Sequence, residues 1–211
     1  MISPPNGYIN TSYVRVKEEK IESMSSMKLL GYVFGTEPNA AAHISEIKKK
    51  FRARFWSLVH LRKSGFSGRE LMGLFNVFIR PIIEYCCVIY HPLLTVSQSN
   101  DIERMQKKAV KLAFGWDLNY EEVCAAQDIK SLKTRREEYI DRFVVKTLMN
   151  ERFATNWFPQ RPTNDYNIRN VKPYKETNSR TKRFFNSPLS YMRRRANILY
   201  QESRQNVLDG I

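Results

Sequence analysis

The hydrophobic pattern is strongest in the stretch 71–92, which is apolar on nearly every side of a helix. A helix that is hydrophobic all round is buried, either in a protein core or in a membrane. Ser67 and Glu70 form the capping-box pattern that begins a helix, and Pro92 ends it because the residue before a proline avoids helical geometry. Pro81 removes a backbone donor, so we expect a kink there. The pattern predicts one buried central helix.

Two charged residues, Arg80 and Glu84, interrupt this apolar stretch near its middle. Arginine or aspartate at the centre of a membrane span costs about 2.5–3.5 kcal/mol on insertion scales, which disfavours a membrane helix. Because they are four residues apart, the two side chains share one helix face and can form an ion pair that makes burial tolerable. We interpret them as a structural pair. The alternative is that Arg80 is directed at a phosphate and oriented by Glu84.

Helical spacing of apolar residues continues in further segments, and the helix ends are marked by capping residues and glycine. The predicted helices are 40–61, a helix from a cap at Ser97, Ser99 or Asn100 to Gly115, a short helix from the Asn119 cap through Gln127, and 131–153.

Two segments near the N-terminus predict strands. Residues 13–16 alternate between apolar and polar, and 27–34 form a stronger strand. The polar residues 17–20 between them predict a hairpin turn. Two strands alone are marginally stable, so we expect this hairpin to pack on a helix.

The pattern changes near Ala154, where helical periodicity is lost and prolines recur. Ten Lys or Arg residues stand against two acidic residues in 161–195, and aromatic residues are interleaved with them. This predicts an extended, irregular arm over 154–211. Cations that follow a backbone and aromatics that stack on bases suit single strands of nucleic acid; the alternative is a solvated arm whose aromatics pack on the helical body.

The predicted fold is therefore mainly α and has three parts. Residues 1–35 form the hairpin, 36–153 a helical bundle, and 154–211 the basic arm. A chain of 211 residues suits one domain, with or without a tail, and an apolar fraction of 42% is enough for a core.

Charge adds information about partners. Lys and Arg outnumber Asp and Glu by 35 to 21, a net charge of +14, which makes polyanions the expected partner. Nucleic acid is favoured over a lipid surface, because no basic amphipathic terminus or lipidation motif is found. The alternative is that the basic helix faces are only solvated. The candidate phosphate contacts are Lys48, Lys49, Lys50, Arg52 and Arg54 in the first helix, Arg104, Lys107, Lys108 and Lys111 in the third, and Arg169, Arg180, Lys182, Arg183, Arg193, Arg194 and Arg195 in the arm.

Residues that carry chemistry are sparse. Cys86, Cys87 and Cys124 suggest buried thiols in a reducing compartment rather than a disulfide framework, and no zinc-ligand spacing is present. The first twenty residues are polar and show no secretory signal, so we expect an intracellular protein, nuclear or cytoplasmic. A phosphate-binding glycine loop, a nucleophile elbow and paired strand-end aspartates are all missing. These features predict a nucleic-acid binder without a catalytic centre, cofactor or metal of its own.

Seven short motifs occur in an order that resembles one family. They are 28–31, 43–44, 79–85 with the later Pro92, 102–109, 132–136, 165–169 and 180–187. Together they span most of 13–195 and are similar to the region downstream of the catalytic palm in non-LTR (LINE-type) retrotransposon reverse transcriptases.

This resemblance implies specific roles. Leu29, Leu30 and Gly31 match the strand turn at the palm edge that grips the primer, and the helices from His43 onward match the thumb and the helical region after it. The fingers and palm, with their catalytic aspartates and Mg²⁺, have no counterpart here. The resemblance thus implies an inactive fragment that binds RNA or a DNA/RNA hybrid as primer–template. The alternatives are a reverse-transcriptase subunit whose palm and fingers are supplied in trans, and a helical protein-interaction module.

Overall fold

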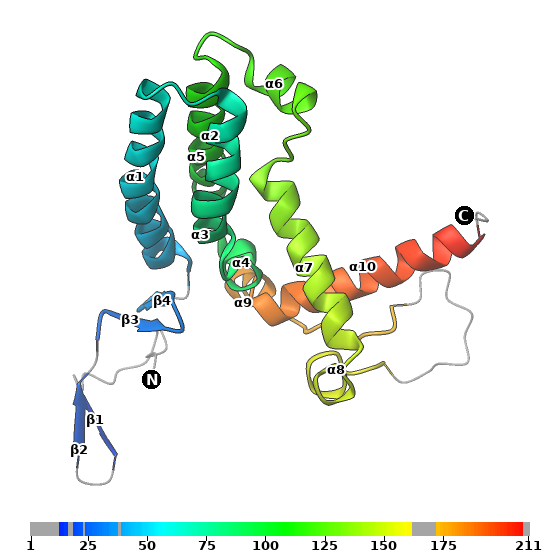
Figure 1. Ribbon diagram of the computed structural model, residues 1–211. Helices are drawn as coiled ribbons and strands as arrows, with labels where there is room; N and C mark the ends of the chain where they lie inside the picture. The colour runs from blue at the N-terminus through cyan, green and yellow to red at the C-terminus, as the bar shows by residue number, and fades with distance from the viewer. Residues whose placement is uncertain (1–12, 17–18, 23, 38, 162–171, 209–211) are drawn as a thin grey trace.

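The structure is a computed structural model that describes the chain except for residues 1–12, 17–18, 23, 38, 162–171 and 209–211. Its described part is mainly helical and carries short β-hairpins at the N-terminal end (Figure 1). The predicted fold class is confirmed.

The N-terminal strands form two hairpins rather than the single one predicted. β1 (Tyr13–Val16) pairs antiparallel with β2 (Glu19–Glu22), and β3 (Ser26–Leu29) pairs with β4 (Tyr32–Gly35). The predicted strand 27–34 is wrong because it folds back at Leu30 and Gly31, which have φ values of +47° and +83°. Two successive positive φ angles make the tight turn whose twist matches that of the flanking strands.

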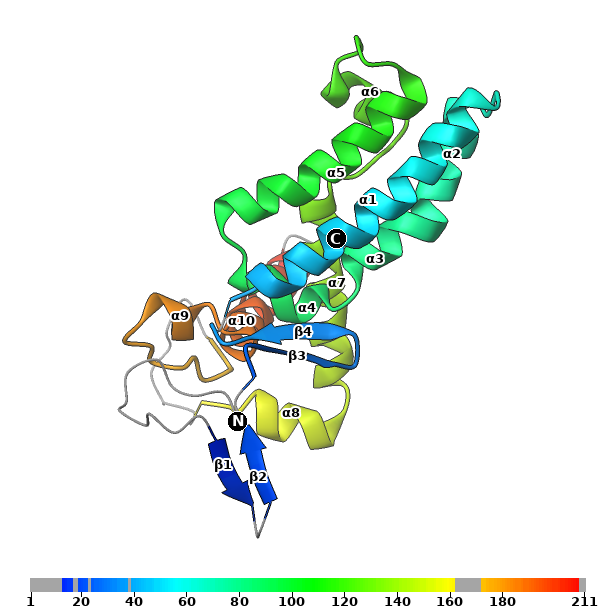
Figure 2. The ribbon, with the colours of Figure 1, turned by 90° about the vertical axis from the view of Figure 1, so that its left-hand side faces the viewer.

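A bundle of near-parallel helices forms the body of the molecule (Figures 1 and 2). α1 (Ala41–Lys63) packs against α2 (Gly68–Leu74) and against α5 (Val96–Phe114). The predicted Ser67–Glu70 capping box begins α2, whereas α5 begins at a Thr95–Gln98 capping box and not at the predicted cap. The core of this bundle contains Ile44, Ile47, Phe51, Leu58, Leu71, Phe75, Ile79, Ile83, Ile102 and Ala109.

The predicted central helix is divided into several pieces. The π-helix η1 (Phe75–Ile79) follows α2, then come α3 (Arg80–Glu84), α4 (Cys87–Tyr90) and the 3₁₀ turn η2 (His91–Leu93). The expected distortion at Pro81 takes the form of the π-helix η1. Its wider turn accommodates the proline ring, which would clash with the carbonyl four residues back, and the missing backbone N–H of the proline. A continuous helix to Pro92 is wrong, since Cys86 adopts a left-handed φ of +58°.

The break at Cys86 also bears on membrane crossing. Among the described residues, no single helix is long and apolar enough to span a bilayer; Gly68–Glu84 and Cys87–Leu93 reach that length and composition only together, with a bend of 47° between them.

Burial of the central stretch is one-sided. Ile79 and Ile83 are buried, but Val77, Phe78 and Tyr85 are 64%, 56% and 53% exposed. The prediction of burial on every side is therefore wrong. Helix α1 covers one side of η1 and α3, and the exposed residues lie on the other side.

The second half of the bundle contains α6 (Tyr120–Ala126), α7 (Leu132–Leu148) and α8 (Glu151–Trp157). The predicted cap Asn119 is confirmed, and Ser131, the start of the predicted helix 131–153, is the cap of α7; each accepts a hydrogen bond from its own helix. The predicted helix 131–153 is too long, since the chain leaves α7 after Leu148 and begins α8 after Asn150.

The C-terminal segment is largely ordered into helices, so the prediction of an extended arm is wrong for this part. α9 (Lys182–Phe185) is short, and α10 (Pro188–Leu208) packs against α7. Pro188 begins α10 because a proline in the first turn lacks only a donor that would be unpaired anyway. Ile140 and Val144 of α7, Phe158, and Met192 and Ala196 of α10 form a second core.

Candidate nucleic-acid interface

Asp101 joins the basic faces of α1 and α5, which lie side by side (Figure 2). Its carboxylate lies 2.5 Å from the Lys48 ammonium of α1 and 2.6 Å from the Arg104 guanidinium of α5. The hydrogen bond from Lys48 lowers the pKa of the Asp101 carboxyl, so this group stays ionised. The pairing brings two of the predicted sets of cations into one surface, which we call the α1–α5 surface.

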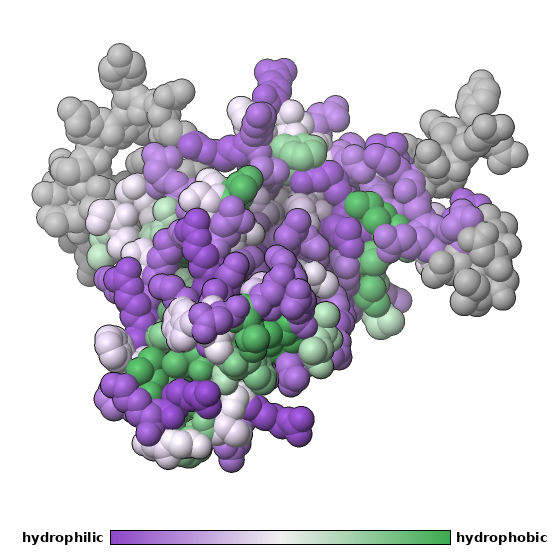
Figure 3. All heavy atoms as spheres, turned by 90° about the horizontal axis from the view of Figure 1, so that it is seen from above, coloured by the Kyte–Doolittle hydropathy of each residue, from purple (hydrophilic) through white to green (hydrophobic). Residues whose placement is uncertain are grey.

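The predicted cations of α5 share its outer face. Arg104, Lys107 and Lys108 are exposed, and Lys111 donates a 3.0 Å hydrogen bond to the carbonyl of Trp116. They lie three or four residues apart, opposite the stripe that enters the core, so they point to one side of the helix. Seen from above, hydrophilic residues cover most of the visible face, with apolar residues in small patches between them (Figure 3).

The predicted cations of α1 do not share one face. Lys48 reaches Asp101, Lys49 and Arg52 are exposed, and Lys50 and Arg54 line a groove on the side of α3. Arg52 follows Lys48 by one turn, so it lies toward α5. Lys48 and Arg52 therefore belong to the α1–α5 surface, whereas Lys50 and Arg54 belong to a different site.

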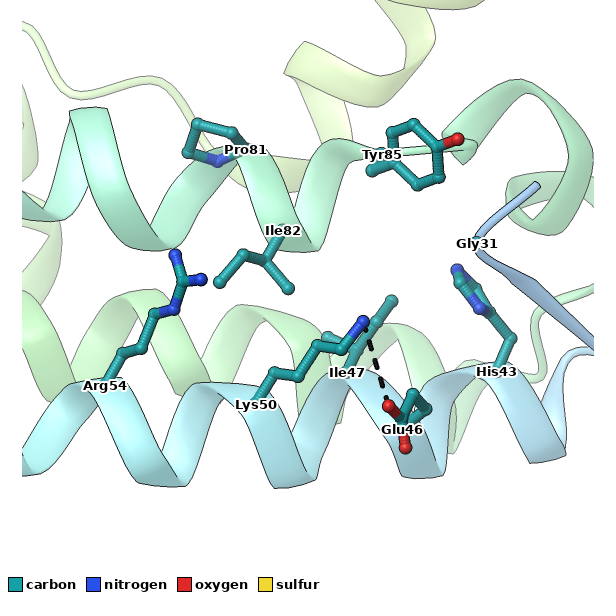
Figure 4. A pocket seen from close by; sticks show the side chains of 9 residues that line it. All are labelled: Gly31, His43, Glu46, Ile47, Lys50, Arg54, Pro81, Ile82 and Tyr85. Atoms are coloured by element: carbon teal, nitrogen blue, oxygen red, sulfur yellow. Dashed lines mark ion pairs between the residues drawn. The ribbon is translucent and has the colours of Figure 1, made fainter. Parts of the chain in front are cut away.

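The groove is about 320 Å³ in volume and lies between α1 and α3, next to the β3–β4 turn (Figure 4). Sequence reasoning missed it, because its two walls come from separate helices. The one local signal is the spacing of Lys50 and Arg54 by one helical turn. Its lining residues are Gly31, His43, Glu46, Ile47, Lys50, Arg54, Pro81, Ile82 and Tyr85.

Of the predicted primer-grip-like residues, Leu29 ends β3, Leu30 and Gly31 form the β3–β4 turn, and Gly31 lines this groove. The Tyr85 hydroxyl donates a 2.6 Å hydrogen bond to the Leu30 carbonyl, and a Cβ at Gly31 would lie 3.0 Å from the Tyr85 ring. Leu30 is 85% exposed and has a φ of +47°, a conformation that leucine rarely adopts. An exposed, strained leucine at this position is a candidate contact for a ligand.

Replacing Leu30 by asparagine is expected to stabilise the fold by about 0.5–1 kcal/mol, because asparagine tolerates a positive φ and little packing is lost. Urea unfolding monitored by circular dichroism measures this change. Leu29→Asn is the control, since Leu29 lies in strand β3 and is expected to give no gain. A loss of stability in Leu30→Asn would show that the leucine side chain packs in a way that its exposure does not reveal.

The predicted pair Arg80 and Glu84 lies one helical turn apart in α3. Arg80 Nε is 3.9 Å from a Glu84 oxygen, and Arg80 donates a 2.8 Å hydrogen bond to the side chain of Asn76. The closer partner of Glu84 is Arg135 of α7, which binds both carboxylate oxygens. Arg135 was not foreseen, because the contact joins residues 51 positions apart.

The predicted arm cations are engaged to different degrees. Arg193 donates to the Trp157 carbonyl, Arg194 lies 3.6 Å from the centre of the Phe185 ring, and Arg195 forms two hydrogen bonds with Asp141. These three side chains thus hold α10 in place. Arg180 and Lys182 are exposed, Arg183 lies 3.1 Å from Glu37, and Arg169 falls outside the described residues.

A buried polar cluster, missed by sequence reasoning, joins α7 to the chain around η2. Arg136 is fully buried, donates 3.3 Å hydrogen bonds to His91 Nδ1 and Ser99, and lies 3.8 Å from Glu103. Glu103 also accepts hydrogen bonds from the first two backbone amides of α7. In the described part of the chain, no group of three or more His, Cys, Asp or Glu residues could hold a metal ion.

Burial, followed by the charge of Arg136, lowers the pKa of His91 to about 4. Because the unfolded chain binds this proton near pH 6.5, stability is expected to fall as the pH drops from about 6.5 toward 4, by about 3 kcal/mol in all. The charges of Lys133 and Arg195 lower this pKa further, and Glu137 lies 4.0 Å from His91 Nε2. Urea unfolding at pH 7 and pH 4.5 measures the loss.

The variant His91→Asn keeps an acceptor for Arg136 and removes the titrating ring, so it should lose less stability on acidification. His60→Asn is the control, because His60 is exposed. Equal acid sensitivity in all three proteins would contradict this role of His91.

No match to this chain is found among models of known protein families, among curated protein sequences or among solved structures.

Proposed function

We propose that this chain binds nucleic acid on the α1–α5 surface, as a thumb-like, primer–template-binding part of a non-LTR reverse transcriptase. The observation that carries the proposal is the pairing of Asp101 with Lys48 and Arg104, because it places cations of two helices on one surface. The order of the sequence motifs supports the family, and the net charge of +14 supports a polyanionic partner.

The spacing of the α5 cations suits a phosphate backbone. Arg104 and Lys111 are seven residues apart, which is roughly 10 Å along a helix. Double-stranded DNA presents a phosphate on each strand about every 3.4 Å along its axis, so this row spans about three of them. Lys48 and Arg52 lie on the adjacent helix and widen the contact. Such contacts go to phosphates, and we therefore expect binding that is insensitive to base sequence.

A salt titration tests this function. Binding of a fluorescent DNA/RNA hybrid, followed by anisotropy, is expected to weaken linearly on a log–log plot, with a slope of about −0.9 for each phosphate contacted, as on B-form DNA. The proposal fails if the protein does not bind the hybrid at low salt.

A protein partner is the second candidate, and the β3–β4 hairpin favours it. Met27 and Leu29 pair with Phe34 and Tyr32, so all four side chains lie on one face of the hairpin. Tyr32 is buried there, whereas Met27 and Leu29 are 49% and 52% exposed. The apolar face thus extends beyond the helices that cover it, as expected if a palm supplied in trans docks on it.

Size-exclusion chromatography and primer extension separate these possibilities. Self-association that persists at high salt supports a protein-interaction module. DNA synthesis that occurs only after a palm fragment is added supports the subunit in trans.

A further inference from the structure

We infer that the groove between α1 and α3 holds one unpaired nucleotide, with its phosphate between Lys50 and Arg54. This inference rests on the proposed function and adds to it a subsite for a single nucleotide. Figure 4 shows the side chains that line this groove.

Lys50 and Arg54 provide a phosphate site at one end of the groove. Both extend from α1 toward α3 (Figure 4), and Glu46, the one acidic residue in the lining, lies 3.7 Å from Lys50. Arg54 donates a 2.7 Å hydrogen bond to the Phe78 carbonyl of η1. This bond fixes the guanidinium and leaves further donors for a phosphate oxygen, which arginine and lysine bind strongly.

Apolar side chains form the wall beside these cations. Ile47 of α1 and Ile82 of α3 face each other across the groove, with Pro81 at its edge. Apolar surface next to two cations matches a molecule with a flat, weakly polar part and an anionic part. A nucleotide has both, through its base and its phosphate.

His43 provides a polar group at the closed end of the groove. It is 3% exposed, and its Nδ1 accepts a hydrogen bond from the Val33 amide. The neutral ring therefore carries its proton on Nε2. This nitrogen is buried beside Tyr85 and has no hydrogen-bond partner of normal geometry among the described residues. The neighbouring acceptor is the backbone carbonyl of Tyr85, and an acceptor on the edge of a base that enters the groove would satisfy this nitrogen instead.

The size of the groove favours one nucleotide over a base-paired step. A volume of about 320 Å³ lies at the lower end of the roughly 300–1,000 Å³ typical of small-ligand pockets. A base must leave its stack to enter such a groove. The free-energy cost of unstacking is smallest for a base that is already unpaired. The exposed Lys49 lies on α1 between the groove and the α1–α5 surface, because it precedes Lys50 by one residue.

The experiment compares two labelled DNA/RNA hybrids, one fully paired and one with a single bulged 2-aminopurine nucleotide. We expect the protein to bind the bulged hybrid about tenfold more tightly, a difference of about 1.4 kcal/mol, and to change the 2-aminopurine fluorescence. Lys50→Gln and Arg54→Gln should abolish this preference. The matched controls Lys49→Gln and Arg52→Gln remove the same charge from α1 outside the groove, and they should weaken binding of both hybrids equally.

The outcomes distinguish the two proposals. Binding of both hybrids with equal affinity and unchanged 2-aminopurine fluorescence overturns the nucleotide subsite and leaves the proposed function intact. No binding of either hybrid overturns the proposed function. A titration with AMP identifies the source of the nucleotide. Saturable AMP binding that is lost in Arg54→Gln indicates a free nucleotide. A change in 2-aminopurine fluorescence that persists when AMP is added indicates a nucleotide of the bound strand.

Discussion

Replacing Arg52, Lys107 and Lys108 together by glutamine is expected to weaken binding of a DNA/RNA hybrid by about 10²-fold or more at 0.1 M salt. Each phosphate contact contributes about −0.9 to the slope of log affinity against log salt, so the loss of three contacts removes a large part of the counterion release. All three side chains are exposed, so the fold should be preserved. The salt slope should become shallower by about 3 units.

A control triple variant separates the effect of the α1–α5 surface on binding from the effect of the net charge. Lys146, Arg152 and Lys175 are exposed and lie on α7, on α8 and ahead of α9. Their replacement by glutamine removes the same net charge from outside the α1–α5 surface. An equal loss of affinity in both triple variants would mean that the protein attracts nucleic acid by charge alone, without a defined surface.

Glu103→Ala is expected to lower the free energy of unfolding by about 3–5 kcal/mol, because it removes the carboxylate that lies 3.8 Å from the fully buried Arg136. It also removes the acceptor for two amides at the start of α7. The midpoint of urea unfolding at pH 7 measures this cost.

A double-mutant cycle tests whether this loss of stability arises from the unpaired charge of Arg136. In an Arg136→Met background the buried cation is absent, so Glu103→Ala should cost only about 1 kcal/mol, through the lost cap of α7. The same cost in both backgrounds would show that Arg136 does not depend on Glu103 for its charge compensation.

Features that depend on neighbours in the chain were predictable. The caps at Ser67, Asn119 and Ser131 follow local rules, since each accepts a hydrogen bond from an amide two or three residues ahead. The hydrophobic pattern does not predict the turn at Leu30 and Gly31, because apolar residues continue through it, whereas the family resemblance implies a strand turn at these residues.

Features that depend on packing were not predictable. Glu84 and Arg135 meet across 51 residues, and nothing local in the sequence distinguishes Arg135 from an exposed cation. The sequence indicates that cations occupy much of the surface of α1, but not that α1 has neighbours on two sides, which divide these cations between two sites. The groove between α1 and α3 could not be predicted for the same reason, because it exists only where α3 lies beside Lys50 and Arg54.

The carboxylate of Asp101 also has a consequence for how the molecule meets a polyanion. By pairing with Lys48 and Arg104, it restricts their side chains before association, and so reduces an entropy cost of about 0.5–1.5 kcal/mol for each long side chain immobilised. At the same time its negative charge repels any phosphate from the middle of the surface. A bound strand should therefore leave a footprint with a gap at Asp101, flanked by protected nucleotides on both sides.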